Sequence, residues 1–168
     1  LLKNTTDKNA KAYLINHFLD QFKGTIYRQT MFAEFELEMG KMSENGETLT
    51  ADALCKKYYE LNKLYFGPDM VSDEEIALEW SRIPHFFYNY YVFQYATGFS
   101  AAVAIANRIL EKGAPAVADY KRFLSSGSST DPISLLNIAG VDMSSPEPIN
   151  EALKLFGSLI DELDALLK

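Results

Sequence analysis

Apolar residues recur at helical spacing along the whole chain, and no alternating strand pattern lasts more than a few residues. The pattern therefore predicts an all-α protein. Thr6 is the predicted cap of a long first helix, which Asn45 and Gly46 end. The buried side of this helix is expected to carry Leu14, Phe18, Phe22, Ile26, Phe32 and Phe35.

A second helix is predicted to begin after Thr50 and to stop at Gly67. Its apolar side is expected to carry Leu54, Tyr58, Leu61 and Leu64. The segment 72–75, with the sequence SDEE, has the pattern of a capping box. It predicts a short helix that continues through Trp80.

Pro84 is predicted to begin the next helix, because proline suits a first helical position and forces the preceding Ile83 out of the α region. We expect this helix to continue to Leu110 and to end at Lys112 and Gly113. Shorter helices are predicted over 115–125, over 132–139 behind Asp131 and over 146–167, with SSGSST as a surface loop. Without repeats or a clear boundary, residues 1–168 are expected to form a single helical region, one helical bundle.

The run from residue 83 to residue 107 contains no Asp, Glu, Lys or Arg, yet it carries one histidine and four tyrosines. It is long enough to cross a bilayer. Its polar residues are spread along its length, whereas a membrane helix collects tyrosines at its ends, and we therefore expect no membrane segment. Polar groups this dense on an uncharged segment suggest the wall of an enclosed polar site.

The overall composition fits one soluble core: 168 residues, 48% hydrophobic and with a net charge of −7. Nucleic acid is an unsuitable partner, because the chain has no cluster of basic residues to neutralise phosphates. Cys55 is the only cysteine, which excludes an internal disulfide and favours a reducing, cytoplasmic location. The start of the chain has no Met and no signal pattern, and we expect Leu1 and Leu2 to end a preceding helix of something longer.

The candidate chemistry lies at the start of the uncharged run. On a helix that begins at Pro84, His85 and Tyr88 are one turn apart on one face, Val92 and Tyr95 extend that side, and Tyr91 lies one step around. Histidine and phenol groups together are neutral donors of the kind that stabilise an oxyanion or hold a carbonyl. The alternative is that the tyrosines form a stripe of core aromatics and that His85 is a satisfied histidine at a helix start.

Metal binding has little support in the residues themselves. His17 and His85 are far apart in sequence, and neither HExxH nor a Cys/His pair with ligand spacing is present. Glu34, Glu36 and Glu38 could include one carboxylate ligand, but such a helix face is more often solvated. GxSxG, P-loop and GxGxxG patterns are also missing from the sequence.

Three long segments resemble a known family: IYRQTMFAEFE at 26–36, DEEIALEWSRIPHFFYNYYVFQYATGFSAA at 73–102 and LLNIAGVDMSSPEPINEAL at 135–153. They are similar to the C-terminal part of oligoendopeptidase F, a group of zinc metallopeptidases in the M3 family. The resemblance covers nearly the whole chain in the right order. It implies a mostly α-helical enzyme with a deep channel that cleaves internal bonds of short peptides.

The same resemblance implies where the zinc lies. In that family two histidines of HExxH and a later glutamate hold the metal, and all three lie N-terminal to the region matched here. We therefore expect zinc in the full-length enzyme, no zinc on this chain, and the N-terminal part of the same peptidase as a partner.

By resemblance, His85 and Tyr88 become the candidate catalytic residues and Tyr91 and Tyr95 the candidate substrate-binding residues. Zinc would polarise the scissile carbonyl, and His85 and Tyr88 would donate hydrogen bonds to the oxygen on which negative charge grows. On its own, the chain is expected to be inactive. A non-catalytic helical module that binds a partner protein remains the alternative.

Overall fold

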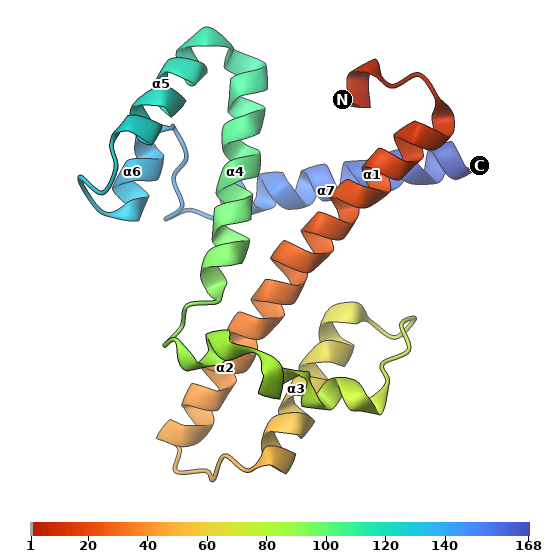
Figure 1. The fold of residues 1–168 in the computed structure, drawn as a ribbon, viewed down its shortest axis with the longest axis vertical. Coiled ribbons are helices and arrows are strands. Elements are labelled where there is room, and N and C mark those ends of the chain that lie inside the picture. The colour runs from red at the N-terminus through yellow and green to blue at the C-terminus, as the bar shows by residue number, and fades with distance from the viewer. Residues whose placement is uncertain (1) are drawn as a thin grey trace. The chain divides into compact units, whose positions relative to one another are not determined.

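The computed structural model describes residues 2–168, and within that range the chain forms helices joined by turns and no strand (Figure 1). This confirms the predicted all-α class. The expectation for Leu1 lies outside the described residues. Two compact units are present: Lys23–Ala96 forms one, and the residues up to Phe22 form the other together with Thr97–Lys168. That residues 1–168 are one region of a larger catalytic domain stays a prediction.

The unit that contains both ends of the chain consists of long helices and two short ones. Its elements are η1 (Leu2–Asn4), α1 (Lys8–Phe22), α4 (Phe93–Lys112, from Thr97 on), α5 (Ala114–Ser125), α6 (Pro132–Ile138) and α7 (Glu147–Leu167). Helix α1 packs against α7, and α5 packs against α6 (Figure 1). The ring of Phe22 lies at the centre of the α1–α7 core, 5.1 Å from Phe99 and 5.4 Å from Phe156. A second cluster, around Ala104 and Val141, joins α4 to the segment after α6.

Helix ends in this unit follow their capping residues. Asp131 caps α6, with its Oδ1 accepting from the backbone N–H of Ser134 as predicted. Helix α4 ends at Lys112 before Gly113, whose φ of 64° suits a glycine. The predicted cap at Thr6 is wrong: Asp7 Oδ1 accepts from the N–H of Ala10, so α1 begins one residue later.

The other unit carries the candidate residues. Its elements are the π-helical turn η2 (Lys23–Tyr27), α2 (Arg28–Glu44), α3 (Ala51–Phe66), and the 3₁₀ helices η3 (Glu74–Arg82) and η4 (Pro84–Phe87). Helix α3 packs against both α2 and η3. The buried core they share consists of Met31, Phe32, Phe35, Leu54, Tyr58, Leu61, Ile83 and Val92.

Several local predictions for this unit are confirmed and others need correction. Thr50 caps α3 by accepting from the N–H of Ala53, and α3 ends before Gly67. Leu64 is exposed instead of facing the core. The capping box at 72–75 is not formed, because Ser72 Oγ accepts from the side chain of Asn62 instead. Over residues 2–168, no helix combines the length and the apolar character that crossing a membrane requires.

Candidate functional site

The segment that carries His85 is held to the core at both ends. Ile83 at its start and Val92 at its end are both buried in the core of their unit. Between them, the ring of Phe86 packs edge-on against Phe32 and Phe35, with centroid distances of 5.5 and 5.2 Å. The apolar residues thus fix residues 83–92 on the unit, and the polar residues between them stay at its surface.

His85 lies at the centre of a cluster with three tyrosines, which we call the His85 cluster. Its ring centroid is 5.8 Å from that of Tyr88, 5.8 Å from that of Tyr91 and 5.6 Å from that of Tyr95. Tyr91 is stacked on the imidazole, whereas Tyr88 and Tyr95 meet it edge-on. Atom Nε2 of His85 and the hydroxyl oxygen of Tyr95 are 3.0 Å apart and share one hydrogen bond. The structure therefore brings together all four residues proposed from the sequence.

The predicted way of bringing them together is wrong. The helix expected from Pro84 to Leu110 is broken: η4 ends at Phe87, and α4 begins only at Phe93. Between them, Asn89 and Tyr90 have positive φ values of 52° and 59°. On a straight helix, residues ten positions apart would be separated by about 15 Å, so the contact of His85 with Tyr95 requires this turn.

The cluster is accessible in this chain. Tyr88 is 58% exposed, Tyr91 and Tyr95 are each 39% exposed, and His85 is half-buried. Val92, expected on the same side, points instead into the core. A stripe of buried core aromatics would show the reverse pattern, so the rings of the three tyrosines do not form the core of this unit.

The shared hydrogen bond leaves one proton for a ligand in either arrangement. If the hydroxyl of Tyr95 donates to Nε2, then the imidazole carries its own proton on Nδ1. If Nε2–H donates to Tyr95, the phenolic proton is available to the adjacent hydroxyl of Tyr91 or to a ligand. Partial burial and the adjacent hydroxyl of Tyr91 raise the pKa of Tyr95 above its ordinary value. Tyr95 therefore stays a neutral donor at neutral pH.

Helix α2 contributes a residue whose role sequence reasoning missed. Glu36 is only 6% exposed, and its Oε1 accepts from the backbone N–H of Tyr90 at 2.6 Å. The expected solvated face of glutamates is therefore wrong at this position. Its neighbours are also engaged, Glu34 with the hydroxyl of Tyr65 and Glu38 with Lys41. Spacing alone gave no signal for Glu36, because its partner is a backbone group 54 residues away.

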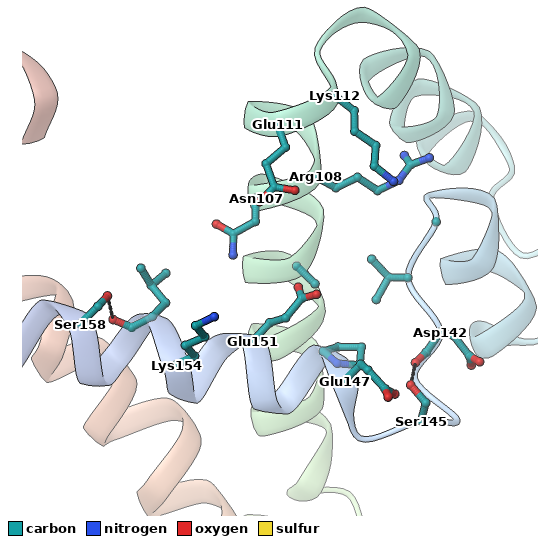
Figure 2. A pocket seen from close by; sticks show the side chains of 15 residues that line it. Asn107, Arg108, Glu111, Lys112, Asp142, Ser145, Glu147, Glu151, Lys154 and Ser158 are labelled. Atoms are coloured by element: carbon teal, nitrogen blue, oxygen red, sulfur yellow. Dashed lines mark hydrogen bonds between the residues drawn. The ribbon is translucent and has the colours of Figure 1, made fainter.

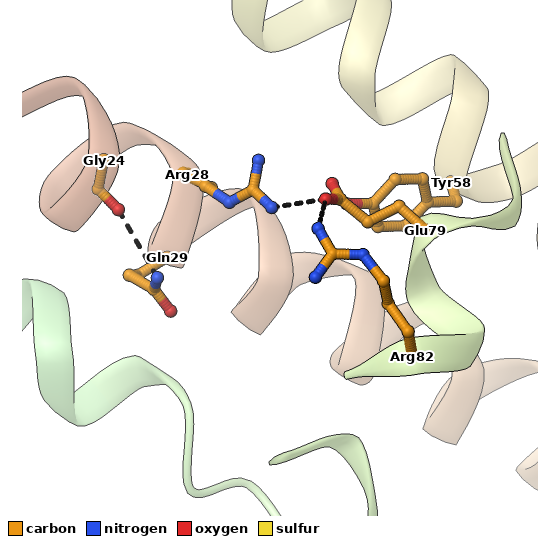
Figure 3. A network of polar contacts seen from close by, with 6 residues as sticks. All are labelled: Gly24, Arg28, Gln29, Tyr58, Glu79 and Arg82. Atoms are coloured by element: carbon orange, nitrogen blue, oxygen red, sulfur yellow. Dashed lines mark hydrogen bonds and ion pairs between the residues drawn. The ribbon is translucent and has the colours of Figure 1, made fainter. Parts of the chain in front are cut away.

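A buried carboxylate fixes the element that precedes the cluster (Figure 3). Glu79 of η3 accepts a hydrogen bond of 2.7 Å from the hydroxyl of Tyr58 and pairs with Arg28 at 2.5 Å and with Arg82. Burial by itself raises the pKa of the Glu79 carboxyl, but the hydrogen bonds of Tyr58 and Arg28 and the two positive charges outweigh it and hold that pKa below its usual value. The network ties η3 to α2 and α3, just before Ile83.

Metal ligands do not gather in the part of the chain that the structure describes. Among residues 2–168, no group of three or more His, Cys, Asp or Glu side chains could hold a metal ion. His17 lies on α1, where it is stacked on Tyr13 and close to Gln21.

A cavity of about 730 Å³ lies elsewhere, in the unit with both chain ends (Figure 2). Arg108 and Lys112 of α4 line one part of it, and Glu147 and Glu151 of α7 line another. Arg108 is already paired with Asp119. The residues that line this cavity include no histidine or cysteine, so we take the His85 cluster as the better candidate for the functional site.

Comparisons with known proteins place the chain among peptidases. The family model for peptidase family M3 matches residues 1–155. The chain is 56% identical over 167 residues to "Oligopeptidase PepF" of Bacillus subtilis (strain 168), covering 99% of this chain and 25% of that protein. It is 43% identical over 168 residues to "Oligoendopeptidase F, chromosomal" of Lactococcus lactis subsp. cremoris, covering 100% of this chain and 28% of that protein.

A solved structure agrees with these relatives. The crystal structure of oligoendopeptidase-F from Enterococcus faecium superimposes with a TM-score of 0.95 at 47% identity, covering 99% of this chain and 32% of that chain. The chain thus spans between a quarter and a third of the length of these relatives.

Proposed function

The chain belongs to peptidase family M3, and on that basis we propose that it is the C-terminal part of a zinc metalloendopeptidase of the oligoendopeptidase F type, which hydrolyses internal bonds of short peptides. Its contribution is one wall of the peptide-binding channel. The N-terminal part of the same peptidase supplies the opposite wall. Cys55 is the only cysteine of this chain, which fits a reducing compartment, and we propose a cytoplasmic location for the enzyme.

The observation that carries this proposal is the exposed His85 cluster. A histidine and three tyrosines present hydrogen-bond donors on rigid rings, and residues 83 and 92 anchor them to a packed core. Such donors bind the backbone of a peptide without requiring a particular side chain. An enzyme that accepts many short peptides needs this kind of surface.

M3 peptidases are generally metallopeptidases, but the side chains described here do not fit a metal centre. We place the zinc ligands and the catalytic base in the N-terminal part of the enzyme, as HExxH and a later glutamate. The activation of water belongs to that part. No step on this chain passes through the metal.

The role of this chain is to bind and to polarise the peptide. His85 and Tyr88 donate hydrogen bonds to the carbonyl oxygen that gains negative charge during hydrolysis. Tyr91 and Tyr95 contact the peptide backbone beside it and keep the imidazole in place through the stacked ring and the shared hydrogen bond.

Replacement of the histidine in the full-length peptidase tests this function. His85→Ala should lower kcat for a short quenched-fluorescence peptide by about 10² or more, because a donor to the developing charge is lost. The matched control is His17→Ala, which removes the chain's other histidine, also stacked on a tyrosine but outside the cluster. Equal activity of the two variants would refute the assignment and would favour a non-catalytic helical module.

A further inference from the structure

Two consecutive residues of the turn before α4 adopt an unfavourable backbone conformation. Asn89 and Tyr90 both lie in the left-handed region, with φ values of 52° and 59°. Asparagine tolerates this region, but a bulky residue such as tyrosine rarely does, because its Cβ lies too close to the following carbonyl oxygen. The turn therefore needs contacts from outside to hold it.

Helix α2 supplies these contacts from two positions one turn apart. Glu36 Oε1 accepts from the N–H of Tyr90, which fixes the backbone of the turn. At Gly40, a Cβ would lie 2.3 Å from the hydroxyl oxygen of Tyr90, so only glycine leaves room for this ring. Residues four apart share a helix face, and this face of α2 is shaped to receive Tyr90.

The contact is unfavourable for Glu36 itself. Its Oε2 is buried and has no hydrogen-bond partner in the range 2–168. Burying a carboxylate oxygen without a partner is destabilising, and an apolar side chain of the same size would avoid that loss of hydration. Stability alone therefore gives no reason for a glutamate here, whereas the need to hold the turn does.

We propose that Glu36 and Gly40 are positioning residues for the His85 cluster: they hold the turn at Asn89 and Tyr90 that brings Tyr91 and Tyr95 against His85. They do not touch the peptide. The structural part of this inference stands without the proposed function. Its effect on catalysis rests on that function.

The first test uses the 168-residue chain and keeps the size of residue 36. Glu36→Met removes the acceptor and the buried charge, whereas Glu36→Gln keeps an acceptor for the N–H of Tyr90. NMR of the chain labelled in histidine and tyrosine then measures NOEs from the ring of His85 to Tyr91 and Tyr95. We expect these NOEs in the wild type and in Glu36→Gln, and their loss in Glu36→Met.

The matched control lies two residues away on the same helix. Glu34→Met removes the acceptor of the Tyr65 hydroxyl, 2.6 Å away, and leaves the turn untouched. The NOEs of His85 should survive in this variant. Their survival in folded Glu36→Met, or their equal loss in Glu34→Met, would overturn the inference.

A second pair of variants keeps the proposal testable if Glu36→Met does not fold. Gly40→Ala should displace the ring of Tyr90 and weaken the same NOEs, because its Cβ meets the hydroxyl oxygen. Adding Tyr90→Phe removes that oxygen, and the next ring atom lies 3.5 Å away, an ordinary contact. The double variant should therefore recover the NOEs. Failure of Tyr90→Phe to rescue Gly40→Ala would contradict the proposed fit.

Kinetics in the full-length peptidase separate this inference from the proposed function. If both hold, Glu36→Met lowers kcat about as much as loss of a cluster donor, Glu36→Gln restores most of it, and Glu34→Met stays within about twofold of wild type. If the NOEs are lost but kcat is unchanged, the positioning role stands and the proposed function fails. If the NOEs persist while kcat falls, the positioning role fails.

Discussion

We expect that the hydroxyl of Tyr88 can be removed with an effect on catalysis and little effect on the stability of the fold. Its side chain is 58% exposed, and its hydroxyl makes no hydrogen bond within residues 2–168. The ring contacts His85 and Tyr91 edge-on. Removing the hydroxyl therefore changes what the cluster offers to a ligand and leaves its packing intact.

We expect Tyr88→Phe in the full-length peptidase to lower kcat by about 10² to 10³ with little change in KM, because the lost donor acts on charge that develops in the transition state. The melting temperature of the variant should equal that of wild type. Tyr13→Phe is the matched control, since Tyr13 is also exposed and lies beside a histidine, on α1. A variant that kept more than half of the wild-type kcat would remove Tyr88 from the site.

At the scale of single residues, burial decides which polar groups are structural. Tyr58 lies on the predicted core side of α3, and its hydroxyl is buried against Glu79. The hydroxyl of Tyr88 is open to solvent. The same residue type thus serves packing in one place and presents a donor in the other, and the sequence pattern alone does not distinguish them.

At the scale of elements, the 3₁₀ helix η3 determines where the His85 segment begins. Glu79 attaches it to Arg28 of α2 and to Tyr58 of α3, while the indole N–H of Trp80 reaches Cys55 Sγ at 3.4 Å. The ring of Trp80 also lies 6.3 Å from that of Phe35 of α2, so η3 is joined to α2 by an aromatic contact as well as by the buried carboxylate.

Glu79→Gln should destabilise the chain at neutral pH by about 1–2 kcal/mol, less than for a fully buried pair, because Arg28 and Arg82 remain partly solvated. Since the folded state holds the pKa of the Glu79 carboxyl below its ordinary 4.5, the stabilisation is complete above that pH and is lost as the pH falls further. The difference between variant and wild type should therefore shrink below about pH 4.5. Urea titration followed by the fluorescence of Trp80, the only tryptophan, measures it.

The exposed glutamate four residues earlier in the same element provides the control. The side chain of Glu75 makes no ion pair or hydrogen bond in the described range, and Glu75→Gln should change the unfolding free energy by less than about 0.5 kcal/mol at any pH. A loss in Glu79→Gln that stayed constant from pH 7 to pH 3 would show that the carboxylate charge is not what holds η3.

At the scale of the whole molecule, the chain divides its polar chemistry unevenly between two units. The unit Lys23–Ala96 carries the His85 cluster and its supports. The other unit has two apolar clusters and ion pairs such as Lys11 with Glu162. Neither unit gathers metal ligands in the described range.

The isolated 168-residue chain should hydrolyse no short peptide and retain no stoichiometric zinc after dialysis. The reason is that hydrolysis by a metallopeptidase requires ligands and a base that these residues do not provide. A fluorogenic peptide assay and elemental analysis of the purified chain measure both quantities. Chelator-sensitive cleavage by the purified chain, or one tightly bound zinc ion, would contradict the placement of the zinc ligands in the N-terminal part of the enzyme.

The amino-acid sequence was enough to predict the helical class, the ends of several helices and the residues of the candidate site. These depend on local rules: apolar spacing at 3.6 residues, capping at Thr50 and Asp131, and the family resemblance of long segments. Tertiary structure decided how the site is built. The turn at Asn89 and Tyr90 contains no glycine from which it could be predicted. It exists because Glu36, distant in sequence, accepts a hydrogen bond from the N–H of Tyr90. Local propensity predicts one unbroken helix there, but contacts between distant residues stabilise the turn instead. These contacts offset the backbone strain of the turn only when α2 is folded beside it.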